Sequence, residues 1–231
     1  MLTIIALFAF ICLGMWQTDR ASQKSQIYDT FVAAQSAPPL KYSDLLAIGL
    51  SNQEIALRNV TLSGKFDNKA TYLLDNQVVG GIAGYYILSG FSISGSERPV
   101  LINRGWIPAG DDRNVVSPIN TPTDYIDISG RLIFPEDNWF IGENAAEHLS
   151  NGFVRVLEIN IEKISVDSKI NYLPFIILLD VEIGGGFARK WPMPKGSEMR
   201  HQGYAFQWFL MALAVLIIYV CTNLKKKLNN G

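Results

Sequence analysis

An uncharged apolar stretch near the C-terminus, YAFQWFLMALAVLIIYVC at residues 204–221, constrains this chain more than any other feature of its sequence. As a helix that rises 1.5 Å per residue, it spans about 27 Å, close to the hydrocarbon thickness of a bilayer. Tyr204 and Trp208 near one end and Tyr219 near the other are typical of the two membrane interfaces. The stretch therefore predicts a transmembrane helix over residues 203–222, surrounded by membrane lipid.

The residues that flank this helix indicate its orientation. Three lysines follow it at positions 225–227, and a short positive tail normally stays in the cytoplasm. We therefore expect residues 223–231 to form a cytoplasmic basic tail. His201, just before the helix, then lies at the extracytoplasmic surface of the membrane.

A second apolar segment begins the chain, from Met1 to Trp16. It is about 24 Å long as a helix, and it becomes long enough to span a bilayer if Arg20 extends toward the interface. A cleaved signal peptide is the alternative, but no basic residues precede the apolar run and no small-x-small site follows it. We expect a retained transmembrane helix over residues 1–19. Both chain ends are then cytoplasmic, and residues 20–202 lie outside.

The sequence between these helices carries mainly strand signals. Residues 21–35 are predicted to continue the first helix, and a proline pair at 38–39 precedes a short amphipathic helix within 41–52. Strands are then expected between Gly, Pro and Asn turns, at residues 55–66, 71–79, 84–93, 99–107, 125–134, 152–159 and 172–182. The predicted fold class is an α+β membrane protein, in which two transmembrane helices flank a β-rich, barrel- or sandwich-like extracytoplasmic domain.

The chain has few of the residues that catalytic sites need. His148 and His201 are its only histidines, and the sequence contains no G-x-S-x-G, H-E-x-x-H or phosphate-binding-loop motif. A net charge of −1 gives no bulk basic character for nucleic-acid binding. We predict that the protein is not an enzyme and does not bind nucleic acid; a hydrolase dependent on one of the histidines is the least favoured alternative.

The segment NRGWIP at residues 103–108 stands out within the predicted domain. One interpretation is structural: the glycine permits a bulge, Trp106 packs, and Arg104 pairs with a carboxylate. The other is a contact surface, because tryptophan and arginine are frequent anchors of protein interfaces. The residues alone favour the structural interpretation slightly.

Two further groups lie at the predicted membrane surface. On a helix, His201, Tyr204, Ala205 and Trp208 share a face, which offers an imidazole above two aromatic rings. An apolar macrocycle that holds a metal would find an axial nitrogen ligand there, whereas the simpler interpretation is an interfacial histidine that hydrogen-bonds to the domain.

Trp16, Arg20 and Lys24 form a stripe on the first helix, each four residues from the next. As interfacial anchors and a solvated face they need no further role. Alternatively, Arg20 and Lys24 meet the propionates of a haem or an acidic partner, since arginine geometry suits carboxylates.

Three stretches together resemble the SURF1 family. LGMWQ at residues 13–17, followed by Arg20 and Lys24, is similar to the family's first-helix signature L-G-x-W-Q-x-x-R-x-x-x-K. VLINRGWIP at 100–108 is similar to its N-R-G-W-V-P strand, and HQGYAFQWF at 201–209 is similar to its closing H-L-G-Y-A-x-x-W-F motif. The segment VRVLEIN at 154–160 departs from the family, because it lacks the tryptophan and the acid of W-x-x-I-D.

The resemblance implies a role in the biogenesis of haem-copper terminal oxidases, chiefly cytochrome c oxidase. Bacterial members are associated with haem a, with the histidine before the second helix as the candidate ligand, and His201 is the matching position. The resemblance therefore predicts haem a as a transient cofactor, with His201 as the axial ligand of its iron. Trp208 and Tyr204 are predicted to line the macrocycle, and Arg20 to neutralise a propionate.

The same resemblance implies partners and a location. Haem A synthase would supply the haem, and cytochrome c oxidase subunit I would receive it. Arg104, Trp106, Trp16 and Lys24 are the predicted partner contacts. The absence of a transit peptide suggests a multi-pass protein of the bacterial inner membrane with a periplasmic domain, and the alternative function is a cofactor-free scaffold that stabilises an oxidase subunit.

Overall fold

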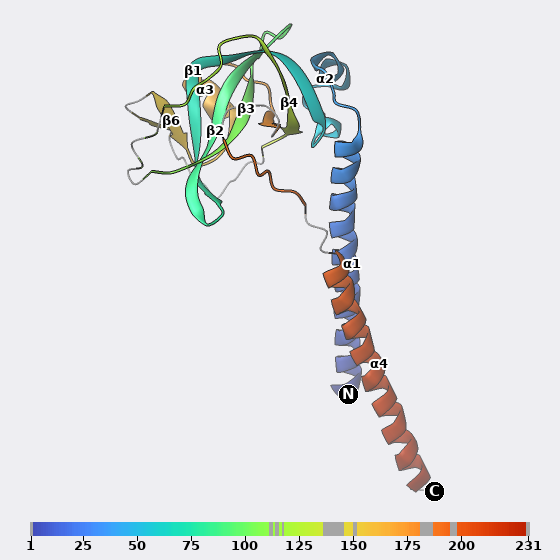
Figure 1. Cartoon of the computed structure of the whole chain (residues 1–231). Coiled ribbons are helices and arrows are strands. Elements are labelled where there is room, and N and C mark those ends of the chain that lie inside the picture. The colour runs from blue at the N-terminus through green and yellow to red at the C-terminus, as the bar shows by residue number, and fades with distance from the viewer. Residues whose placement is uncertain are drawn as a thin grey trace. The chain divides into compact units, whose positions relative to one another are not determined.

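Figure 1 shows a computed structural model of the chain. The structure describes residues 2–110, 113, 116, 118–135, 146–149, 152–180, 187–194 and 198–229, with the side chains of 68–70 and 224–229 excepted. The chain forms two compact units, a helical unit of residues 1–33 and 193–231 and a β-rich unit of residues 34–192. The β-rich unit is therefore inserted between the two parts of the helical unit.

Two long helices make up the helical unit and lie side by side (Figure 1). They are α1 (Leu2–Ser36) and α4 (Glu198–Asn229), and the parts at 2–36 and 198–223 are long and apolar enough to cross a membrane. Most of their large apolar side chains are exposed, as a surface that faces lipid requires. The prediction of an apolar helix at each end is confirmed, and α1 continues through the polar residues 21–35 as expected.

Five strands close a barrel in the β-rich unit. In sheet order they are β1 (Asn59–Val79), β2 (Ile82–Ile93), β3 (Val100–Pro108), β7 (Ile176–Leu179) and β4 (Ile126–Ile133), which returns to β1. All the pairings are antiparallel except that between β3 and β7, which is parallel. Each of the five strands has a partner on both sides, so the predicted β-rich, barrel-like domain is confirmed.

Two short strands extend the sheet beyond the barrel. The second half of β1, at residues 71–74, also pairs in parallel with β6 (Phe153–Val156), and β6 pairs with the two-residue strand β5 (Glu147–His148). Helix α3 (Ile161–Ser168) follows β6. Asn160 caps α3, because its side-chain Oδ1 accepts a hydrogen bond from the backbone N–H of Lys163 at 2.9 Å.

Several predicted boundaries are wrong. The strands expected at 55–66 and 71–79 are one strand, β1, whose pairing with β2 shifts register between Asp67 and Thr71. The strand begins at Asn59 because residues 53–55 form a 3₁₀ turn, η1 (Gln53–Ile55). β7 is shorter than the expected 172–182, of which 181 and 182 lie outside the described residues. Helix α3 and strand β5 were not predicted, whereas the helix expected within 41–52 is α2 (Tyr42–Ile48).

Burial explains why β3 and β7 are apolar almost throughout. Along β3, Val100 and Ile102 belong to one core cluster and Leu101 to another. Along β7, Ile177 and Leu179 alternate with Ile176 and Leu178 between the same two clusters. Successive side chains of a strand point to opposite faces, so both faces of these strands are covered. Ile164 of α3 lies in the second cluster, which fixes the helix against the sheet.

Candidate functional site

Helices α1 and α4 meet along a seam with a regular spacing. Phe10 stacks on Trp208 with ring centroids 5.8 Å apart, and Gln17 hydrogen-bonds to His201. Position 10 therefore lies opposite 208 and position 17 opposite 201, which makes the two helices antiparallel. The buried small residues between and beyond these pairs continue the four-and-three spacing of a helix seam; they are Gly14 and Ala21 on α1 and Ala205 and Ala212 on α4.

Gly14 allows a close approach of the two helices. A Cβ atom at this position would lie 2.5 Å from the ring of Phe209, which is closer than a van der Waals contact permits. Small residues at helix contacts are typical of membrane helices, because packing replaces the hydrophobic effect there. The glycine of the LGMWQ stretch is thus a packing residue.

The polar contact of the seam is a hydrogen bond of 2.8 Å between His201 Nδ1 and Gln17 Oε1. The amide oxygen can only accept, so Nδ1 carries the proton and donates. In a neutral imidazole the other nitrogen, Nε2, then has a free lone pair. A histidine that ligates a metal is typically held in this way, with its second ring nitrogen donating to an oxygen acceptor.

The other residues predicted at this surface lie at or beside the seam. Trp208 is partly buried against Phe10, while Tyr204 is 48% exposed, to the side of the seam. On α1, Trp16 is 56% exposed, and exposed Arg20 donates from Nη1 to Gln23 Oε1 at 3.0 Å. The structure therefore brings His201 and Trp208 into the helix contact, and it leaves the side chains of Tyr204, Trp16 and Arg20 accessible.

Lys24 lies one turn beyond Arg20 on α1 and is partly buried. The stripe of Trp16, Arg20 and Lys24 is distinct from the seam residues Gln17 and Ala21, because neighbouring positions on a helix differ by about 100°. This stripe remains a predicted contact for a propionate or a partner.

Arg104 is buried in the β-rich unit, with only 3% of its surface exposed. Its guanidinium lies between the rings of Phe66 and Phe187, 5.0 Å from each centroid. Nη1 donates to Thr121 Oγ1 and Nη2 to the carbonyl oxygen of Asn120, both at 2.7 Å. No carboxylate among the described residues forms an ion pair with this arginine, so the expected pairing is replaced by aromatic and neutral hydrogen-bond contacts.

Burial and, as a smaller cause, the positive charge of Arg189 together lower the pKa of Arg104 to about 10. Arg189 Nε donates to the carbonyl oxygen of Arg104 at 2.7 Å.

A bulge lies at Arg104 in the pairing of β2 with β3. Ile87 of β2 faces Gly105 and the next residue, Leu88, faces Asn103, so Arg104 has no partner in the register. Gly105 has a φ of +126° at this bulge, a conformation that favours glycine.

Trp106 is also buried, at 8% exposure, and its Nε1 donates to the carbonyl oxygen of Gln77 at 3.0 Å. Its backbone exchanges hydrogen bonds of 2.8 and 3.0 Å with Ala188. The contacts that the structure shows for Arg104 and Trp106 are thus internal to the β-rich unit and follow the structural interpretation of NRGWIP. Their role as partner contacts stays a prediction.

Glu147 and His148 of β5 are both exposed, and each pairs with a side chain from another element. Arg155 forms two hydrogen bonds with the Glu147 carboxylate, at 2.8 and 2.9 Å, and these hold the pKa of Glu147 below its ordinary value. His148 Nε2 lies 2.9 Å from Asp167 Oδ1. Among the described residues, no group of three or more potential ligands is positioned to hold a metal ion.

These features define a class of protein: a β-barrel domain carried between two terminal helices that can anchor it in a membrane. The model of the SURF1 family matches residues 4–213, and the chain belongs to this family. It is similar to a SURF1-like protein of Rickettsia felis, with 21% identity over 226 residues, covering 95% of this chain and 94% of that protein. A SURF1-like protein of Rickettsia conorii is 21% identical over 225 residues, covering 95% and 88%.

Membership of the SURF1 family implies a role in cytochrome c oxidase assembly. The family is one of assembly factors, which agrees with the scarcity of catalytic motifs in the sequence. Gln17 is the site residue that sequence reasoning missed as a functional group. It was recognised only as part of a motif, and its partner 184 residues later in the chain could not be inferred from helical spacing within one segment.

Proposed function

We propose that this protein binds haem a and aids its delivery into subunit I of cytochrome c oxidase. The observation that carries the proposal is the hydrogen bond between His201 Nδ1 and Gln17 Oε1. It joins the two helices at the end of the apolar stretch of α4 and fixes the tautomer that leaves Nε2 available. An imidazole in this state is the axial ligand that haem iron accepts.

The surrounding residues fit the predicted cofactor. Trp208 and the half-exposed Tyr204 supply aromatic surface on the His201 side of α4. The exposed guanidinium of Arg20 lies one turn of α1 beyond Gln17 and would pair with a propionate. Haem a, when bound, would supply an iron that needs a nitrogen ligand and a macrocycle that needs apolar cover. A site with one such ligand holds the haem loosely enough to release it.

The proposal includes a route and a location. Haem A synthase would supply the haem, and the protein would carry it without transforming it, so no catalytic group is required. The protein would reside in the bacterial inner membrane as a multi-pass protein, with both termini cytoplasmic and the β-rich unit periplasmic. This orientation rests on the lysines at 225–227.

The stripe of Trp16, Arg20 and Lys24 on α1 is the proposed contact with a partner in the membrane. Trp16 is 56% exposed, and tryptophan and basic residues at an interface bind either lipid headgroups or a neighbouring helix. Lys24 would extend that contact outward. Arg104 and Trp106 would act from inside the domain, by holding the barrel wall that a partner contacts.

Purification of the full chain from cells that produce haem a tests the proposal. The wild type should carry a Soret absorption band, and His201→Ala should lose it. His148→Ala is the matched control, because it removes the chain's other histidine, which is exposed and pairs with Asp167. It should keep the band.

Two results would contradict haem binding at this site. One is a Soret band retained in His201→Ala. The other is a colourless wild-type protein that still restores cytochrome c oxidase in cells lacking it, which would indicate the cofactor-free scaffold.

A further inference from the structure

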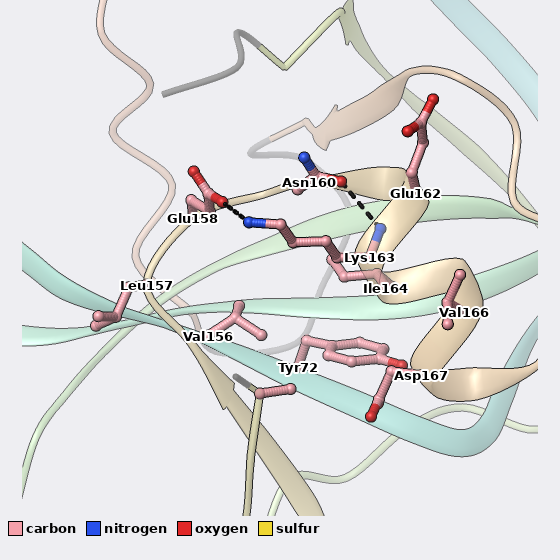
Figure 2. Close-up of a pocket in the computed structure, with 11 residues that line it drawn as sticks. Tyr72, Val156, Leu157, Glu158, Asn160, Glu162, Lys163, Ile164, Val166 and Asp167 are labelled. Carbon is pink, nitrogen blue, oxygen red and sulfur yellow. Dashed lines mark hydrogen bonds and ion pairs between the residues drawn. The ribbon is translucent and has the colours of Figure 1, made fainter. Parts of the chain in front are cut away.

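A groove with a volume of about 630 Å³ opens in the β-rich unit between helix α3 and strand β6. Figure 2 shows α3 along one side of it, with the ring of Tyr72 beneath the helix. The turn at residues 157–160 joins β6 to α3 and forms one end of the groove. This volume is within the range of natural binding pockets, about 300 to 1,000 Å³.

The groove has an apolar floor and an apolar rim. Tyr72 and Ile164 lie at the floor, at 0% and 4% exposure, and belong to the core cluster that fixes α3. Leu157 and Val166 form the rim and are 39% and 80% exposed. Leu157 and Val166 thus add exposed apolar surface to the apolar floor of the groove, and contiguous exposed apolar surface is typical of contact sites.

A polar group lies at the same floor. The Tyr72 hydroxyl is buried beside Asp167 and Ser168, yet it makes no hydrogen bond of standard geometry with a described residue. Buried polar groups normally have a partner. A donor at the tip of a bound side chain would complete the environment of this hydroxyl and of Asp167 together.

The charges around the groove are mainly negative. Three carboxylates line it, those of Glu158, Glu162 and Asp167, against one cation, Lys163. Lys163 Nζ lies 2.8 Å from Glu158 Oε1, so this pair is already neutralised. Asp167 contacts His148, and Glu162 has no ion pair with any described residue. The groove therefore favours a positive occupant, and its negative charge disfavours an anionic lipid surface.

We propose that the groove between α3 and β6 binds a segment of a partner polypeptide that carries an aliphatic side chain next to a lysine or arginine. The aliphatic group packs between Leu157 and Val166 over the floor. The basic side chain lays its stem on apolar surface and brings its charged end to Asp167 beside the Tyr72 hydroxyl, while Glu162, in the first turn of α3, adds to the negative charge of the groove. The proposal rests on the proposed function in one respect, because it takes the partner to be a protein met during oxidase assembly.

A titration with two peptides tests the groove itself. The full chain, reconstituted in lipid nanodiscs with labelled Ile, Leu and Val methyl groups, receives a short peptide with one leucine between two lysines. The methyl signals of Leu157, Ile164 and Val166 should shift and saturate, while that of Val78, also exposed at 65%, should not. The same peptide with glutamates in place of lysines should bind at least about tenfold more weakly.

A charge variant sharpens this result. Glu162→Lys changes the charge at an exposed position in the first turn of α3, and the affinity for the lysine peptide should fall about tenfold. The Ile164 methyl signal of the free variant, unchanged from the wild type, checks that α3 is still folded. The proposal is overturned if the groove methyls do not respond to the lysine peptide. It is equally overturned if both peptides bind alike or if Glu162→Lys leaves the affinity unchanged.

A measurement in cells separates this inference from haem binding. Val166→Asp should lower the cytochrome c oxidase content of membranes, whereas the purified variant should carry as much haem a as the wild type; Val78→Asp is the matched control. Oxidase content equal to the wild type would overturn the partner role. A colourless wild-type protein would instead contradict haem binding and leave the peptide titration valid.

Discussion

The guanidinium carbon of Arg104 lies 5.0 Å from the ring centroid of Phe66, in the interior of the β-rich unit. A planar guanidinium can stack on an aromatic ring while two of its nitrogens donate to Asn120 and Thr121. A lysine ammonium has neither the plane nor the fork. A lysine in place of Arg104 would therefore leave buried oxygen acceptors without donors.

We expect Arg104→Lys to lower the free energy of unfolding of the full chain in detergent by about 1–3 kcal/mol. The denaturant midpoint of the barrel transition measures this. Arg200→Lys, at an exposed position of α4, is the control and should leave the midpoint in place. Equal midpoints for both variants would show that the buried contacts of Arg104 contribute nothing to stability.

Gly14→Leu should separate the two terminal helices. The first added carbon already meets the Phe209 ring at 2.5 Å, so a branched side chain must displace this ring, and we expect the helix backbones to move apart as well. Spin labels at exposed positions 15 and 206, three residues out of register along the antiparallel pair, should report a longer distance. Ile217→Leu, at another exposed position, should give the wild-type distance; an unchanged distance in Gly14→Leu would show that the Phe209 ring moves aside and that the glycine does not set the helix separation.

Gln17→Leu should remove the tautomer preference of His201. In the wild type, nitrogen NMR of the histidine-labelled chain at alkaline pH should show Nδ1 protonated and Nε2 unprotonated, because the amide oxygen accepts from Nδ1. In the variant the two forms should mix. Protonated Nε2 in the wild type would contradict the hydrogen bond, and this measurement needs no haem.

Glu147→Gln should make the stability of the β-rich unit less dependent on pH. Arg155 lowers the pKa of Glu147 in the folded state, so the ion pair stabilises the protein above the ordinary pKa of a glutamate, about 4.3, and is lost as the pH falls through the lowered value. The melting temperature of the variant should lie below that of the wild type at pH 7, and the difference should vanish near pH 2. A constant difference across this range would exclude the ion pair as its cause.

Much of the architecture follows from local sequence signals. Residues 204–221 predict α4 because an uncharged apolar stretch of that length is typical of a membrane-spanning helix, and Pro38–Pro39 follows the end of α1 at Ser36. The strands expected at 84–93 and 99–107 form close to those bounds as β2 and β3, which pair as a hairpin across a turn at Ser94 and Gly95. These elements can be predicted because the signals that define them, an apolar composition and the turn residues, are local in the sequence.

The features that escaped prediction depend on distant contacts. Residues 67–71 look like a break between strands, but pairing with β2 continues across the shift and makes β1 one strand. Helix α3 is eight residues long, too short to be stable alone, and packing of Ile164 on the sheet decides its conformation. The partner of Gln17 lies at the other end of the chain, so its hydrogen bond required the two helices to be placed together.

The parallel pairing of β3 with β7 has a consequence for biosynthesis. Until residues 176–179 are made, β3 and β4 are both open edges of a four-stranded sheet, and exposed edges can pair with other chains. Loop closure over so long a segment is slow. Strand β7, which closes the barrel between β3 and β4, is the last strand of the domain to be synthesised, shortly before α4. The nascent chain therefore remains vulnerable to aggregation and proteolysis through most of its synthesis.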